Sequence, residues 1–175
     1  MKLDFEYGQG TMTAELPDNT DVFVPGQTVA DPPAIPEADV EEETRRAIQN
    51  PMGMDPIPKL VGPDSKVAIV FPDRVKGGSH PTAHRRVAIP ILIEECLKAG
   101  VKKENLKFIC SNGLHRKNTK KEIRTILGED LFNEYWWTGQ IVNHDSEDWD
   151  NLVDLGEDEL SDHVIMNKEV FEADL

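Results

Sequence analysis

The feature that most constrains the fold is a continuous apolar run, Val-Ala-Ile-Val-Phe, at residues 67–71. Such a run, without polar alternation, is typical of a strand buried on both faces, as in a parallel sheet. A second apolar strand is predicted at residues 106–110, and a helix is predicted between them at residues 85–98. A strand, a helix and a strand at this spacing form a βαβ unit with parallel strands and a right-handed crossover. We therefore expect an α/β protein with a parallel-sheet βαβ core.

The helix of this unit contains a proline. Pro90 lies in the middle of residues 85–98. Proline lacks the backbone N–H that an internal helical position donates, and its ring collides with the preceding turn. We therefore expect either a kink at Pro90 or a helix that begins near Ile89.

Residues 1–65 are expected to form a small β-rich amino-terminal segment that packs on the core, and residues 66–175 to form the α/β domain. The elements predicted in the first segment are a hairpin of residues 3–7 and 12–16, a short strand at 22–25 and a helix at 41–49. The further elements predicted in the second are helices at 120–127 and 129–135 and short strands at 141–142 and 164–166. Thr119 and Glu122 have the spacing of a capping box for the helix at 120–127. Because the chain stops at Leu175 without a turn or cap, we expect it to be truncated before its last strands and a second domain.

Composition points to a cytoplasmic protein. The chain has 175 residues and a formal net charge of −14. No apolar run approaches the roughly 18 residues of a transmembrane helix, and the amino terminus lacks the apolar core of a secretory signal. Cys96 and Cys110 lie in apolar surroundings and are expected to be core thiols rather than a disulfide. Without a Cys-x-x-Cys pair, a zinc site is not indicated.

Positive charge is concentrated in the middle of the chain. Residues 66–128 hold 14 basic and 5 acidic side chains, although the chain as a whole is acidic. One interpretation is solvated helix faces, which we expect for Lys102, Lys103, Lys120 and Lys121. The other is an anion site, for which the candidates are Arg74, Lys76, Arg85, Arg86 and Arg116. Nucleic acid is not the expected anion, since the basic stretch lacks interleaved aromatic residues.

Three loops that follow predicted strands carry ionisable side chains. They are residues 73–76, 112–116 and 143–145. In an open α/β sheet the carboxyl ends of parallel strands meet at one edge, which is where ligands bind. His115 follows an Asn-Gly turn and is the strongest candidate for proton transfer, and Asp73 is a candidate to orient it. Asp73 could instead only bond the backbone of its own loop, as Asp does in turns.

Other residues allow both a functional and a structural interpretation. Gly77 and Gly78 could give a phosphate close access or simply provide flexibility. His80 and His84 could be ordinary surface residues, or they could join His115 and Asp73 in a metal-dependent hydrolase, although their spacing matches no ligand motif. Trp136 and Trp137 could form a ligand wall, but packing at a helix end is the expected role.

The chain resembles a known family, the amino-terminal domain of lactate racemase and its relatives, the nickel-pincer nucleotide enzymes. The segments that carry the resemblance are residues 7–10 (Tyr-Gly-Gln-Gly), 16–18 (Leu-Pro-Asp), 47–53, 66–73, 112–116 (Asn-Gly-Leu-His-Arg) with Thr119, 128–130, 143–145 (Asn-His-Asp) and 167–175. Each segment is short, but their order and spacing together are fairly specific and run over nearly the whole chain.

The resemblance implies racemisation or epimerisation of a small 2-hydroxy acid. A histidine removes the hydroxyl proton while hydride passes from C2 to a nickel-pincer nucleotide, and return to the opposite face of the planar 2-keto acid inverts the centre. The histidine of the family's Gly-x-His-Arg motif is His115, one of two acid–base histidines. Asp73 matches the first residue of the family's Asp-x-Thr-Arg loop. The lysine that anchors the cofactor, the nickel-binding histidine and the second catalytic histidine are expected beyond Leu175, so the isolated chain is expected to be inactive.

Several contacts to substrate or cofactor are assigned by the same resemblance. The candidates are Arg74, Lys76, Arg116, Thr119 and His144, and no metal ligand is assigned within this chain. Lys76 stands where the family has arginine, unless Arg74 takes that role, and lysine offers a point charge instead of a two-pronged fork. A non-catalytic anion- or nucleotide-binding module is the alternative function. We expect no nucleic-acid or membrane partner, and a homo-oligomer is possible.

Overall fold

The computed structural model describes residues 1–24, 26–30, 32–76, 80–160 and 162–175. The chain divides into two compact units, Met1–Ile35 and Pro36–Leu175. The strands are β1 Lys2–Tyr7, β2 Gly10–Glu15, β3 Val67–Pro72, β4 Leu106–Ser111, β5 Ile141–Asn143, β6 Leu152–Glu157 and β7 His163–Asn167. The α-helices are α1 Val40–Gln49, α2 Ile57–Leu60, α3 His84–Lys98, α4 Lys120–Leu127, α5 Glu129–Tyr135 and α6 Lys168–Phe171, and short 3₁₀ turns lie at Glu37–Asp39, Lys103–Asn105 and Trp149–Asn151.

The first unit holds the predicted hairpin. Strands β1 and β2 pair antiparallel, from Lys2↔Glu15 to Tyr7↔Gly10. Gly8 has a φ of +59°, which the tight turn requires and which side-chain-bearing residues rarely adopt. The short strand expected at residues 22–25 is absent from Val22 to Val24, and Pro25 lies outside the described residues. The division into functional domains at residue 65 stays a prediction.

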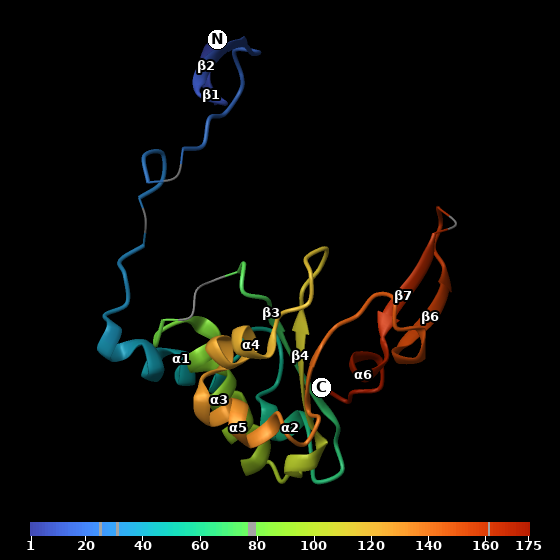
Figure 1. The fold of residues 1–175 in the computed structure, drawn as a ribbon. Helices are drawn as coiled ribbons and strands as arrows, with labels where there is room; N and C mark the ends of the chain where they lie inside the picture. The colour runs from blue at the N-terminus through green and yellow to red at the C-terminus, as the bar shows by residue number, and fades with distance from the viewer. Residues whose placement is uncertain (25, 31, 77–79, 161) are drawn as a thin grey trace. The chain divides into compact units, whose positions relative to one another are not determined.

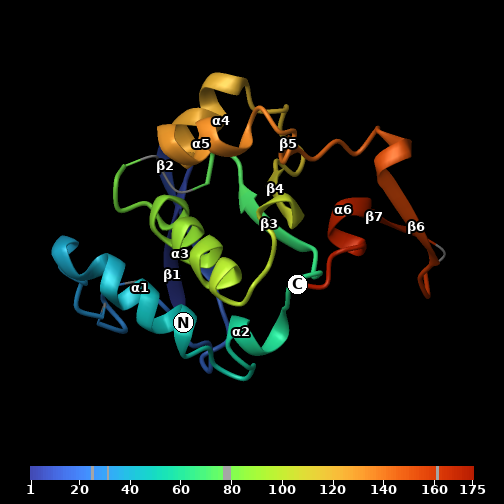
Figure 2. The same ribbon diagram turned by 90° about the horizontal axis from the view of Figure 1, so that it is seen from below.

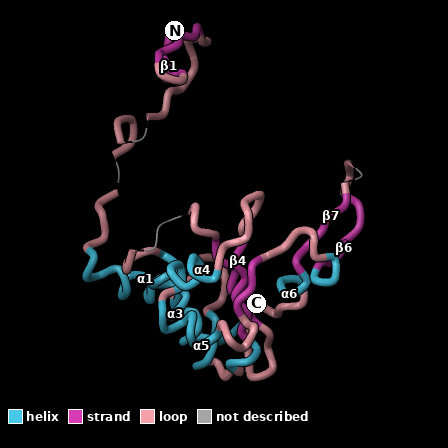
Figure 3. The backbone as a smooth tube through the Cα atoms, in the orientation of Figure 1, coloured by secondary structure: helices cyan, strands magenta, loops and turns pink. Residues whose placement is uncertain are grey.

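The second unit is built on a parallel sheet of three strands in the order β3-β4-β5. Strands β3 and β4 pair from Val67↔Leu106 to Pro72↔Ser111, and β4 and β5 pair from Phe108↔Ile141 to Cys110↔Asn143. Helix α3 connects β3 to β4, so the predicted βαβ unit is confirmed. All three strands therefore end at the same edge of the sheet, where the loops after β3 and β4 project (Figure 3).

Helices α3, α4 and α5 lie together on one side of this sheet, and α6 lies on the other (Figures 1 and 2). The alternating strand residues that face the three helices form the core with them. They include Val67, Ile69, Phe71, Leu106, Phe108 and Cys110 from the strands and Ile89, Ile93, Ile123, Ile126, Leu131 and Phe132 from the helices. On the α6 side, Lys107 of β4 pairs with Glu169 of α6 at 3.1 Å. The mixed α/β fold is thus as predicted.

Burial of β3 on both faces was expected, and this is wrong at one position. Val70 on β3 is 49% exposed, whereas its partner Ile109 on β4 is 1% exposed. The sheet order gives the reason, because β3 has a strand partner on one side only and β4 is central. The chain end runs beside β3, with Asp174 N donating to Lys66 O at 2.8 Å and Ala68 N to Leu175 O at 2.9 Å.

The first residues of α3 and α4 test two expectations, the start of the helix that contains Pro90 and the capping box at Thr119. Helix α3 begins at His84 and continues through Pro90, so a start near Ile89 is wrong. Pro90 is exposed, on the side of α3 away from the core. Helix α4 has the full capping box at Thr119 and Glu122, as predicted.

Among the described residues, no helix is both long and apolar enough to cross a membrane.

The predicted short strand at residues 164–166 is part of β7, which pairs antiparallel with β6 in a separate two-stranded sheet. The two cysteines are free and buried, as expected. Burial raises the pKa of the Cys110 thiol to about 12, so it is protonated at neutral pH.

The core can be tested at Phe108, which is fully buried and contacts Tyr135 with 4.7 Å between ring centroids. We expect Phe108→Ala to lower the free energy of unfolding by about 3–5 kcal/mol, because it removes buried apolar area and leaves a cavity. Urea unfolding followed by circular dichroism measures this. Leu160→Ala, at a 76% exposed position, is the control and should change stability by less than about 0.5 kcal/mol.

Candidate functional site

The site lies at the carboxyl edge of the sheet, where the loops after β3 and β4 meet. Pro72 and Ser111 are the last paired residues of these strands, so Asp73 and Asn112 begin neighbouring loops. After Asn112 the chain makes a tight turn in which His115 N donates to Asn112 O at 2.9 Å. Asn112 Nδ2 closes the turn from its side chain by donating to His115 O at 3.1 Å. This local geometry turns His115 back toward Asp73.

His115 and Asp73 form a hydrogen-bonded pair. Nδ1 of His115 lies 2.6 Å from Oδ2 of Asp73. The Asp73 side chain is 3% exposed and the His115 side chain 45% exposed, so one partner is buried and the other reaches solvent. The other carboxylate oxygen of Asp73 accepts a hydrogen bond from Val75 N at 3.1 Å. Asp73 thus bonds its own loop and His115 at once, so it does more than bond the backbone of its loop.

The electrostatics of this pair fix the tautomer of His115. Burial by itself would raise the pKa of Asp73, but hydrogen bonds from His115 and from Val75 N outweigh it and hold the pKa below its usual value. An ionised carboxylate only accepts hydrogen bonds, so Nδ1 of His115 carries the proton. Nε2 then has a free lone pair and, among the described residues, no hydrogen-bond partner. The arrangement suits a general base that can return the proton it takes.

Arg85 binds the backbone at the point where β3 ends and the loop of Asp73 begins. Its Nη1 donates to Pro72 O at 2.7 Å and to Asp73 O at 2.5 Å, and the residue is 2% exposed. A buried guanidinium bonded to backbone carbonyls holds the end of β3 in place. It is therefore engaged with the backbone at the end of β3, and its place in an anion site stays a prediction.

Asn118 links all three loops, and the sequence reasoning missed it. Its Oδ1 accepts from Arg74 N at 3.3 Å, and its Nδ2 donates to the Cys110 sulfur at 3.3 Å. Asn143 at the end of β5 accepts from Asn118 N and donates to Asn118 O, both at 3.0 Å. Asn118 is 6% exposed. The only available signal in the sequence was a small amide beside the capping box, which does not distinguish it from a surface residue.

The cations expected to contact an anion differ in what surrounds them. Arg74 Nε lies 3.1 Å from Oε1 of Glu122, and Arg116 binds both oxygens of the same carboxylate at 2.8 and 2.9 Å. Lys76 is on the turn that starts at Asp73, its N donating to Asp73 O at 3.2 Å. Its exposed ammonium has no ion-pair partner among the residues that the structure describes. Of the cations that the structure describes in this loop, Lys76 is therefore the candidate to meet an anion.

Thr119 and His144 lie close to these loops but are engaged elsewhere. Thr119 is the N-cap of α4, and its hydroxyl bonds Glu122. Thr119 and Arg74 also border a cavity of about 400 Å³, whose lining is Arg74, Arg85, Thr119, Lys121, Glu122, Thr125 and Ile126. His144 follows β5, and its Nδ1 lies 3.2 Å from Asn167 Nδ2. In the described part of the chain, no hydrogen bond joins His144 to Asp73 or His115.

The remaining candidates lie in different surroundings where they are described. His80 bonds Thr82 at 2.9 Å, and His84 is exposed at the start of α3. Trp136 stacks on Phe132 at 4.8 Å, in the expected packing role, whereas Trp137 is 71% exposed beneath the Lys120 ammonium. Gly77 and Gly78 lie outside the described residues.

The described residues include no group of three or more His, Cys, Asp or Glu side chains placed to hold a metal ion. The hydrolase interpretation, which needed such a group around His80, His84, His115 and Asp73, thus has no support from the described geometry.

Comparisons with known proteins agree on one family. A family model for the lactate racemase N-terminal domain matches residues 7–175. Lactate racemase of Thermoanaerobacterium thermosaccharolyticum is 29% identical over 135 residues, covering 77% of this chain and 29% of that protein. Lactate racemase of Lactiplantibacillus plantarum is 26% identical over 174 residues, covering 99% of this chain and 38% of that protein. This chain therefore spans well under half the length of these relatives.

A solved structure has the same fold. The lactate racemase apoprotein from Thermoanaerobacterium thermosaccharolyticum aligns with a TM-score of 0.66 at 24% identity, covering 100% of this chain and 37% of that one. At this identity the likeness shows the fold alone.

The role of Asn118 as a link between loops can be measured. We expect Asn118→Ala to lower the free energy of unfolding by about 1–3 kcal/mol, because it removes the side-chain hydrogen bonds to Arg74 N, to the Cys110 sulfur and to Asn143 Oδ1. Asn133→Ala, on the exposed face of α5, is the matched control and should change stability by less than about 0.5 kcal/mol. Equal effects of the two variants in urea unfolding would contradict the assignment.

The low pKa of Asp73 predicts a pH-dependent stability. Because folding lowers this pKa, the ionised carboxylate stabilises the fold above the unfolded pKa of about 4, and the contribution is lost as the pH falls through the folded pKa. Asp73→Asn cannot ionise. We expect it to be less stable than the wild type at pH 7, by a difference that shrinks below pH 4. Urea unfolding across this range measures the difference, and one that does not change with pH would exclude this linkage.

Proposed function

This chain belongs to the lactate racemase N-terminal domain family, and on that premise we propose that it supplies an acid–base pair, His115 and Asp73, to a 2-hydroxy-acid racemase or epimerase. The observation that carries the proposal is the 2.6 Å hydrogen bond between a buried carboxylate and a half-exposed imidazole. It leaves Nε2 of His115 without a hydrogen-bond partner among the described residues and so available to a substrate. A cytoplasmic location belongs to the same proposal.

His115 takes the proton of the substrate's 2-hydroxyl on Nε2 and gives it back when the product forms. Asp73 holds the Nδ1–H tautomer and stabilises the imidazolium that exists between the two transfers. Because racemisation runs in both directions, the group must accept and release the proton at the same pH. Histidine side chains, which titrate near neutral pH, meet this requirement.

Lys76 is our candidate to bind the substrate carboxylate. It shares a turn with Asp73 and has no ion-pair partner among the described residues. The ammonium is a point charge that accepts many anion orientations, in contrast to the two-pronged guanidinium of arginine. Arg74 and Arg116 are less available, because Glu122 already neutralises part of their charge.

A nickel-pincer nucleotide, when bound, supplies the hydride acceptor that this reaction requires. The described residues of this chain do not provide a nickel site, since they bring together no suitable group of three donor side chains. We propose that the anchoring lysine, the nickel-binding histidine and the second acid–base histidine lie beyond Leu175, and that the 175-residue chain alone does not turn over substrate.

Replacing His115 tests the function. In the complete protein that carries this chain, with its cofactor loaded, we expect His115→Ala to lower kcat for 2-hydroxy-acid racemisation by about 10²–10⁴-fold, because the proton acceptor is lost. Chiral chromatography of the product mixture measures the rate. Retained activity would overturn the proposal and favour an anion-binding module.

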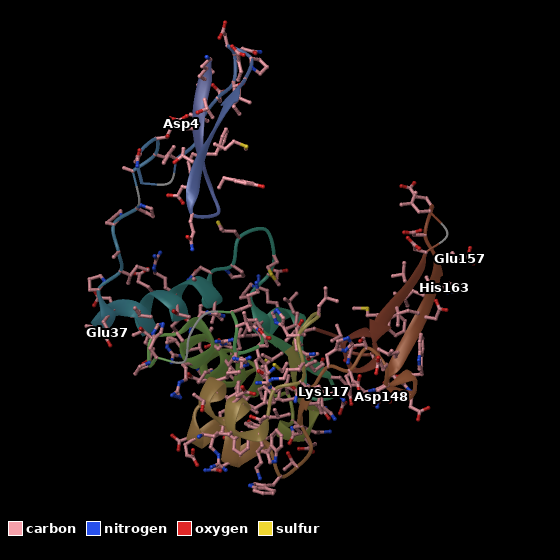
Figure 4. The ribbon with its side chains drawn as sticks, turned by 45° about the horizontal axis from the view of Figure 1, so that its top comes forward. Asp4, Glu37, Lys117, Asp148, Glu157 and His163 are labelled. Carbon is pink, nitrogen blue, oxygen red and sulfur yellow. The ribbon has the colours of Figure 1, made fainter. Side chains whose placement is uncertain are left out.

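A matched control comes from a second histidine–aspartate pair. His163 Nδ1 lies 2.8 Å from Asp154 Oδ2 on the β6–β7 hairpin, which Figure 4 shows carrying His163 and Glu157. Both side chains of this pair are exposed, and they belong to a two-stranded sheet separate from β3-β4-β5. We expect His163→Ala to leave the racemisation rate within about twofold of the wild type, as for a surface substitution.

A further inference from the structure

Each member of the acid–base pair is followed in the sequence by an arginine. Asp73 precedes Arg74, and His115 precedes Arg116. Both arginines reach the same carboxylate, that of Glu122 on α4. Arg74 Nε lies 3.1 Å from Oε1, and Arg116 donates from Nη2 to Oε1 at 2.8 Å and from Nη1 to Oε2 at 2.9 Å. Glu122 thus connects the two loops that carry the acid–base pair.

Glu122 is itself held firmly. Its Oε2 accepts from Thr119 N at 2.8 Å, which is a contact of the capping box, and also from the Thr119 hydroxyl at 3.0 Å. Helix α4 is anchored in turn by Ile123, Ile126 and Leu127, all in the core. Hydrogen bonds from Arg116 and then from Thr119 N lower the pKa of Glu122 to about 2, so it stays ionised across the physiological range.

These contacts close a ring. It runs from Asp73 along the chain to Arg74, across to Glu122, across to Arg116, along the chain to His115 and back to Asp73. Single exposed ion pairs stabilise little, but a bidentate arginine–carboxylate pair within a network is the favourable exception. The ring restricts both loops relative to α4, and therefore restricts the imidazole relative to its carboxylate.

We propose that Glu122 is the positioning residue of the acid–base pair, acting through Arg74 and Arg116. It does not touch the reacting atoms in this assignment. The effect of Glu122 on the hydrogen bond between His115 and Asp73 can be measured without an activity assay. Its effect on turnover rests on the proposed function. The two arginines then serve as structural links, in agreement with Lys76 as the carboxylate contact.

Two variants separate the ring from the helix cap. Glu122→Gln keeps a side-chain oxygen for the capping box, which accepts Glu or Gln, but removes the charge that both arginines bind. Thr119→Ala loses the hydroxyl with its bonds to Glu122 N and Oε2, but keeps the carboxylate, the bond from residue 119 N and both arginine contacts. A third variant, Arg74→Gln with Arg116→Gln, removes the same ion pairs from the other side and leaves Glu122 intact.

The readout is the Nδ1 proton of His115, observed by nitrogen-15 NMR of the 175-residue chain. We expect Glu122→Gln and the double arginine variant to raise its exchange rate with water by about tenfold, as for the loss of charge-assisted hydrogen bonds. Thr119→Ala is expected to lower the urea midpoint while leaving this exchange rate near that of the wild type. A wild-type exchange rate in both Glu122→Gln and the double arginine variant would overturn the proposal. An equal increase of the exchange rate in Thr119→Ala would overturn it too.

Turnover in the complete, cofactor-loaded protein provides a second readout. We expect Glu122→Gln to lower kcat about tenfold with little change in KM, because it disturbs proton transfer and leaves the carboxylate contact in place. A rise in KM with unchanged kcat would instead make Arg74 and Arg116 substrate ligands and overturn the positioning role. If the wild type shows no racemase activity, the proposed function fails, and the NMR result still decides the role of Glu122.

Discussion

The parallel pairing of β3 with β4 is the interaction on which the rest of the structure depends. Its register sets which side chains face α3, and it also sets where the two strands end. A shift by one residue would turn Phe108 to the opposite face of the sheet, since side chains alternate along a strand. The same shift would separate Asp73 from the loop that carries His115. The apolar core and the polar site are therefore fixed by one set of backbone hydrogen bonds.

Local patterns predicted a large part of this molecule. The apolar runs of β3 and β4, the helix between them and the capping box of α4 depend on residues that are neighbours in sequence, and these predictions are confirmed. The meeting of Asp73 and His115 also followed, because parallel strands bring their carboxyl ends to one edge. The exposure of Val70 did not follow, because the run of apolar residues carries no information on which strand lies at the edge of the sheet.

Contacts between distant residues account for what the sequence did not predict. Arg85 and Arg86 are adjacent and identical, yet only the structure shows that Arg85 bonds the backbone at the end of β3. Asn118 acquires its role from Asn143, 25 residues away. Glu122 was recognisable as a cap residue from its spacing to Thr119, but its second role needs two arginines from separate loops. Polar side chains of the same residue type have different roles because they have different partners. A local sequence pattern does not show which partner a side chain will have.

The ring around the acid–base pair has a consequence for charge. Asp73 and Glu122 contribute two negative charges, and Arg74 and Arg116 contribute two positive charges, so the ring is neutral while His115 is neutral. When His115 gains a proton, the whole ring becomes a monocation at the partly exposed imidazole. An anion beside it is then attracted more strongly than before, since Asp73 faces the imidazolium but the ring as a whole now carries a net positive charge. Proton uptake by His115 and retention of an anionic molecule at this edge are therefore thermodynamically coupled, and each favours the other.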